Sequence, residues 1–109
     1  METWYDMHCH LGFAPDPAAT ARAGAHLGIG AFSCTVSPEE YERIAPLMAD
    51  GATMAVGLGA HPWQIADGSV DSGALARFCE LAAATAFIGE VGLDFAGPRD
   101  GNESRAVQT

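Results

Sequence analysis

Short apolar runs alternate along the chain with longer amphipathic stretches, and this pattern predicts strands that alternate with helices. The predicted strands cover residues 4–10, 28–36, 53–60 and 86–94. The predicted helices cover residues 16–27, 37–49 and 70–84, and the first turn of another helix opens at 104. Because crossover helices of about 10 to 15 residues join parallel strands in βαβ units, we expect an α/β fold with a parallel sheet.

Local signals mark several boundaries of the predicted helices. Asp16 and Ser37 each precede a proline, a pairing that is typical of an N-cap followed by the first helical position. Two glutamates follow the second of these prolines and favour the positive end of the helix dipole. We expect Asp50 and Gly51 to end that second helix.

Length and composition are those of one globular domain that covers residues 1–109. Hydrophobic residues make up 49% of the chain and charged residues 17%, which argues against a disordered protein. No apolar run approaches the roughly 18 residues of a membrane span, and no secretion signal is visible. We therefore expect a cytoplasmic protein without a membrane segment, in which Cys9, Cys34 and Cys79 are reduced core residues.

The net charge of −9 results from 14 acidic residues against 5 basic ones, all of them arginine. A basic stripe is the usual mark of a nucleic-acid-binding protein, and this sequence has none. The charge therefore argues against tight, non-specific DNA binding by this chain alone. It does not exclude hydrolysis of phosphates at a metal site, because bound cations can supply the positive charge.

The segment Asp6–His10 carries the first candidate site residues. Side chains alternate along a strand, so Asp6, His8 and His10 share one face. Tyr5, Met7 and Cys9 lie on the other, an apolar face that can pack under helices. Two histidines at positions i and i+2 can bind one cation, and imidazole suits zinc, manganese or iron. Two histidines that are satisfied in the core or at the surface are the alternative.

His61 follows the third predicted strand. Alternation places it on the same face as Gly57 and Gly59, whose small size should leave space inside the sheet beside the imidazole. A single histidine before a proline is more often a loop residue than a catalytic one, so His61 alone is weak evidence.

Glu90 and Asp94 lie on one face of the fourth predicted strand, with Gly92 between them. Two carboxylates on the inner face of a buried parallel strand are costly unless they are paired or bind metal. The alternative is a strand end that is exposed, with solvated carboxylates.

The three segments share one feature: each falls at the carboxyl end of its predicted strand. In parallel (β/α) barrels these ends form the active-site face. Histidines and carboxylates that converge there are typical of a metal site that activates water. The sequence therefore predicts a metal site at this rim.

These segments, in this order, resemble the TatD-like family of metal-dependent hydrolases. The matching segments are DMHCHL at 6–11, GLGAHPW at 57–63, FIGEVGLDF at 87–95 and, more weakly, ESRAVQ at 103–108. The resemblance implies a TIM-like barrel with one or two divalent metal ions (Mg, Mn or Zn), and a deoxyribonuclease that cleaves phosphodiester bonds in DNA, or another phosphoester, with a metal-activated water.

The resemblance also assigns roles to individual residues. His8, His10 and Glu90 would be the metal ligands, with Glu90 also catalytic. His61 and Asp94 are the further catalytic candidates, and Asp6 would lie nearby, where Asp6 or Asp94 could orient a ligating imidazole.

The family's remaining ligands come from later strands, and a closed barrel needs about 250 residues. We therefore expect the chain to be the N-terminal half of the barrel, about four βα units, and to have little activity by itself. The second hypothesis is a module without catalysis, which binds metal or self-associates through open sheet edges. The third hypothesis keeps the enzyme class but replaces DNA with another ester or an amide as the substrate.

Overall fold

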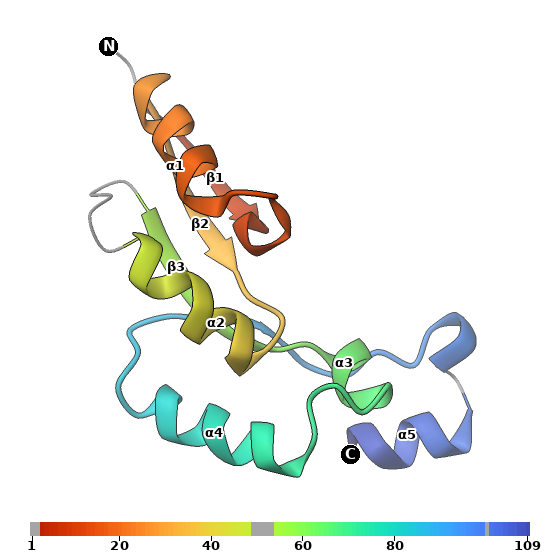
Figure 1. Cartoon of the computed structure of the whole chain (residues 1–109). Helices are drawn as coiled ribbons and strands as arrows, with labels where there is room; N and C mark the ends of the chain where they lie inside the picture. The colour runs from red at the N-terminus through yellow and green to blue at the C-terminus, as the bar shows by residue number, and fades with distance from the viewer. Residues whose placement is uncertain (1–2, 49–53, 100) are drawn as a thin grey trace.

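The computed structural model describes residues 3–48, 54–99 and 101–109, and its centre is a four-stranded parallel sheet (Figure 1). The strand order follows the chain order: β1 (Trp4–Cys9), β2 (Ile29–Cys34), β3 (Met54–Ala60) and β4 (Ile88–Val91). The sheet curls into half of a barrel, and helices alternate with its strands. The predicted fold class, a parallel half-barrel of the TIM type, is confirmed.

The described residues form five helices, which connect or follow the strands. They are α1 (Pro17–His26), α2 (Pro38–Ile44), α3 (Pro62–Ala66), α4 (Ser72–Ala82) and α5 (Asn102–Gln108), with three 3₁₀ segments at Leu11–Phe13, Ala45–Met48 and Gly97–Arg99. The predicted caps are confirmed: Asp16 accepts from the Ala19 N–H at 2.9 Å, and Ser37 accepts from the Glu40 N–H at 3.1 Å. None of the helices described is long and apolar enough to cross a membrane.

The second helix is shorter than the sequence pattern predicts. α2 ends at Ile44 and continues as the 3₁₀ segment Ala45–Met48. Pro46 explains this end, because proline has no N–H to donate and its ring clashes with the preceding turn of an α-helix. The predicted stop at Asp50 and Gly51 lies outside the described residues.

The fourth strand is also shorter than predicted. β4 ends at Val91, and Gly92 has a φ of +142°, which lies outside the backbone range of a strand. The alternation of side chains therefore stops before Asp94. This places Asp94 beyond the strand, so alternation along β4 does not decide which way its side chain points.

Three glycines allow the strands to approach closely near their carboxyl ends. A Cβ on Gly59 would lie 1.7 Å from the Thr35 carbonyl oxygen, and a Cβ on Gly89 would lie 2.6 Å from the Gly57 carbonyl oxygen. The sequence-based expectation that Gly57 and Gly59 leave space beside an imidazole was therefore wrong. They are small because neighbouring backbone already fills that space.

The core lies where α2 packs on the sheet. Ile44 on α2 and Leu58 on β3 are completely buried there, and Val70, which precedes α4, is also almost completely buried. The three cysteines are free thiols, as predicted, but only Cys34 is buried and Cys79 is exposed on α4. The prediction that Cys79 is a core residue was therefore wrong. Helix α4 packs through the neighbouring face, which carries the partly buried Phe78.

Among the residues that the structure describes, β1 and β4 each pair on one side only, so both edges of this sheet are open. On β1, Tyr5 and Met7 are exposed by 65% and 70%, and on β4 Val91 is exposed by 52%. The apolar face of the first strand is therefore not packed under helices, contrary to the sequence-based expectation. An edge strand has no neighbour beyond it whose crossover helix could cover this face.

Candidate metal centre

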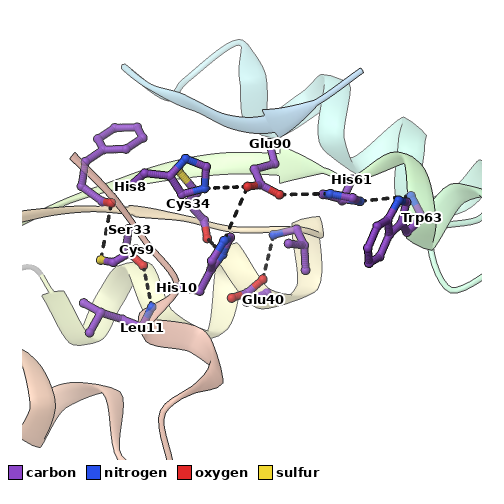
Figure 2. A network of polar contacts seen from close by, with 12 residues as sticks. His8, Cys9, His10, Leu11, Ser33, Cys34, Glu40, His61, Trp63 and Glu90 are labelled. Atoms are coloured by element: carbon purple, nitrogen blue, oxygen red, sulfur yellow. Dashed lines mark hydrogen bonds and ion pairs between the residues drawn. The ribbon is translucent and has the colours of Figure 1, made fainter. Parts of the chain in front are cut away.

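Three imidazoles surround the carboxylate of Glu90 at the carboxyl ends of the strands (Figure 2). Glu90 Oε1 lies 2.6 Å from His8 Nε2 and 3.5 Å from His10 Nε2. Glu90 Oε2 lies 3.2 Å from His61 Nε2. Residues that are far apart in the sequence therefore meet at one point on the rim.

His8, His10 and Glu90 form the tightest part of this group. Each offers one ligand atom, and the three atoms lie within 4.8 Å of one another. The donors are imidazole nitrogens and a carboxylate oxygen, which are the common ligands of zinc and manganese in proteins. The residues present therefore fit the divalent cation that the resemblance implies.

The tautomer of His10 supports this fit. His10 Nδ1 lies 3.0 Å from the carbonyl oxygen of Cys34, which can only accept, so Nδ1 carries a proton. In the neutral ring, Nε2 is left with a lone pair that faces Glu90 Oε1. Two electron-rich atoms that face each other are stabilised by a cation between them. A backbone carbonyl on the other ring nitrogen is also the usual partner of a metal-ligating histidine.

His61 is held in the opposite tautomer. Its Nδ1 accepts a hydrogen bond of 3.1 Å from the backbone N–H of Trp63, as the N-cap of α3. In the neutral ring, Nε2 therefore carries the proton and donates to Glu90 Oε2. This arrangement orients the carboxylate and leaves Oε1 toward His8 and His10.

Asp6 supports the site through the backbone. Asp6 Oδ1 accepts from the backbone N–H of His8 at 3.0 Å and does not bond to an imidazole among the described contacts. The β1–β2 register shifts between Asp6 and Cys9, so the ladder is irregular where the first histidine stands. Asp6 thus constrains the chain that carries His8, while the orientation of the imidazole depends on Glu90.

Asp94 takes part in a separate network. Its carboxylate accepts from the Trp63 indole N–H and from the Ala96 N–H, while the Gln108 side chain bonds to both the N–H and the carbonyl of Asp94. Asp94 is therefore linked to the site by its bond to Trp63, and it lines the same pocket as Glu90 and His61. The expectation that Asp94 shares a strand face with Glu90 was wrong.

The hydrogen bonds to Asp94 predict a pH effect on stability. The Ala96 N–H and, next, the Trp63 indole hold the pKa of the Asp94 carboxyl below its ordinary value. The resulting stabilisation is complete above the unfolded pKa of about 3.9 and is lost as the pH falls through the lower folded value. Asp94→Asn should therefore flatten the loss of stability below about pH 4, measured as urea midpoints across the acid range.

Trp63→Phe is the companion variant for this prediction. It removes the indole donor but keeps the Ala96 N–H bond, so it should flatten the acid limb in the same direction and by less. If the urea midpoint fell equally with decreasing pH in the wild type and in Asp94→Asn, the hydrogen bonds to Asp94 would not be the cause of the acid instability.

A buried thiol next to the site does not join the ligand set. Burial raises the pKa of the Cys34 thiol, and the negative charge of Glu90 raises it further. Cys34 is not among the described residues whose ligand atoms gather in the cluster. Cys34 contributes its carbonyl oxygen to His10 instead.

Aromatic rings flank the histidines, a feature that the sequence motifs did not indicate. Phe13 stacks on His10 with ring centroids 4.9 Å apart, and Trp63 meets His61 edge to face at 5.3 Å. Both aromatic residues come two or three positions after their histidine. A pocket of about 450 Å³ opens beside Glu90 and His61 and extends to Asp94.

Comparison with known proteins supplies the family. A family model described as TatD related DNase matches residues 5–109. This range includes all four segments on which the resemblance was based, and it covers nearly the whole chain. No curated protein matches the chain.

Proposed function

Because the chain belongs to the TatD related DNase family, we propose that it is the cation-binding part of a metal-dependent hydrolase that cleaves phosphodiester bonds in DNA. The family is one of metal-dependent hydrolases, and the half-barrel is the corresponding part of its fold. The observation that carries the proposal is the cluster of His8, His10 and Glu90 at the carboxyl ends of β1 and β4.

The chemistry follows from this donor set. A bound divalent cation would polarise a phosphoryl oxygen, make water a stronger nucleophile and offset negative charge as it develops. His8, His10 and Glu90 would hold it, while His61 fixes the orientation of the Glu90 carboxylate. The cation would also supply local positive charge for a phosphate at the site, in a chain whose net charge is −9.

Cation binding tests the proposal directly. His8→Ala should weaken Mn²⁺ or Zn²⁺ binding by about 100-fold, since loss of a ligand costs at least as much as loss of a supporting residue. Isothermal titration of the chelator-treated protein measures the affinity. His26→Ala is the matched control, because His26 is exposed at the end of α1, outside the cluster.

Hydrolysis of a DNA oligonucleotide with added Mn²⁺ gives a second readout. Turnover should be slow in this chain, absent in His8→Ala and unchanged in His26→Ala. Equal cation affinity in the wild type and His8→Ala, or hydrolysis that persists in that variant, would overturn the proposal.

The open sheet edges favour a second candidate function, self-association of the chain. Tyr5 and Met7 on β1 and Val91 on β4 expose apolar surface beside unpaired strand edges, which are ready sites for pairing with another chain. Tyr5→Lys should therefore lower the mass that light scattering measures at high concentration.

Leu27→Lys is the control for this association. Leu27 is exposed by 69% and lies between α1 and β2, so its side chain belongs to neither edge strand. A wild-type chain that is monomeric at every concentration, or equal masses for the two lysine variants, would exclude edge-mediated association.

A further inference from the structure

Three consecutive carbonyls at the end of β2 hold three different residues of the metal centre. The Cys34 carbonyl accepts from His10 Nδ1 at 3.0 Å. The Thr35 carbonyl accepts from the backbone N–H of Glu90 at 3.3 Å. The Val36 carbonyl accepts from the backbone N–H of His61 at 2.8 Å. The segment Cys34–Val36 therefore sets the relative positions of groups from three other segments.

The Thr35 side chain anchors this segment to β3. Thr35 is completely buried. Its hydroxyl donates to the Gly57 carbonyl at 2.6 Å and accepts from the Gly59 N–H at 2.9 Å, so both hydrogen-bonding roles of the hydroxyl are used. The Thr35 N–H also donates to the Gly57 carbonyl, at 3.1 Å. One side chain thus fixes the end of β2 in two places on the neighbouring strand.

We propose that Thr35 is the positioning residue of the metal centre, whose hydroxyl fixes the β2 carbonyls that hold His10, Glu90 and His61. The inference rests on the proposed function, namely that the cluster binds a divalent cation. None of the motif segments contains Thr35, and it touches neither His8 nor the Glu90 carboxylate among the described contacts. It acts on the ligands through the backbone of β2.

The chemistry of Thr35 makes the inference testable with small substitutions. Valine has the same shape but no hydroxyl, so the buried Gly59 N–H would lose its partner and the end of β2 would shift. Serine keeps the hydroxyl and loses only a methyl group. Residues that support metal ligands typically change metal affinity by about 10- to 100-fold when they are mutated.

Zn²⁺ titration of the folded variants is the first experiment. Thr35→Val should bind Zn²⁺ about 10- to 100-fold more weakly than the wild type, while Thr35→Ser should remain close to it. Tyr41→Phe is the matched control, because it removes one hydrogen bond, between the hydroxyls of Tyr41 and Thr85, which does not involve the metal centre. If Thr35 had a purely structural role, Thr35→Val and Tyr41→Phe would both be less stable than the wild type, and both would keep its Zn²⁺ affinity.

Amide hydrogen exchange of the wild type gives a second measurement that needs no variant to fold. Zn²⁺ should slow exchange at Glu90 and Gly59, whose N–H groups bond to Thr35, more than at Leu75 at the start of α4. Equal Zn²⁺ affinity in Thr35→Val, or equal protection at all three amides, would overturn the positioning role. A wild type that binds no Zn²⁺ would instead overturn the proposed function.

Discussion

Gly59→Ala should unfold the chain or lower its free energy of unfolding by about 3 kcal/mol or more. The new methyl group would lie 1.7 Å from the Thr35 carbonyl oxygen and 3.1 Å from that of Glu90. Both atoms belong to backbone, so relief requires β2 and β4 to move away from β3. Urea denaturation followed by circular dichroism measures the effect. The loss is a large share of the roughly 5 to 15 kcal/mol that stabilises a typical domain.

Gly101→Ala separates this clash from a general effect of replacing glycine. Gly101 has a φ of −68°, and a Cβ there meets no atom within 4 Å. The control should change the unfolding free energy by less than about 1 kcal/mol. Wild-type stability in Gly59→Ala would show that the strands do not approach as closely as described.

Glu90→Gln should remove divalent cation binding, with a loss of affinity of about 100-fold or more. The substitution keeps the shape of the side chain and deletes the charge that His8, His10 and His61 surround. With the amide oxygen turned to the His61 N–H, the amide nitrogen would face His8 and His10 as a donor. It would satisfy the lone pair of His10 Nε2 and leave no position for a cation.

Titration with Zn²⁺ and with Mn²⁺ measures this loss, and Glu103→Gln serves as the control. Glu103 is an exposed acid in the first turn of α5, so its removal changes the net charge equally without touching the cluster. If Glu90→Gln kept the wild-type affinity, the cation would bind elsewhere and the metal centre would have to be reassigned.

The order of strands and helices was predictable because its signals are local. Asp16 and Ser37 cap helices that begin at the prolines after them, and the alternation of strands and helices is that of a parallel fold. The early end of α2 also had a local signal in Pro46. Gly92 ends β4 by a backbone conformation that glycine permits but does not require, so the end of that strand was not fixed in advance.

The candidate site was predictable in its members more than in its geometry. The spacing of His8 and His10, and the parallel fold that brings Glu90 to the same rim, indicated the cluster that the structure brings together. The sequence wrongly placed Asp94 on the strand face of Glu90 and did not single out Thr35. The hydrogen bonds of both residues join segments that are distant in the chain, so no local signal indicates them.

The sequence by itself determined which donors are present, three histidines and a carboxylate at the ends of parallel strands, because residue identity fixes ligand chemistry and alternation fixes the face. The tertiary structure decided what each donor can do. The Cys34 carbonyl leaves His10 Nε2 a lone pair, while the Trp63 N–H makes His61 a donor to Glu90. A tautomer depends on the partner of the other ring nitrogen, and only folding brings that partner near.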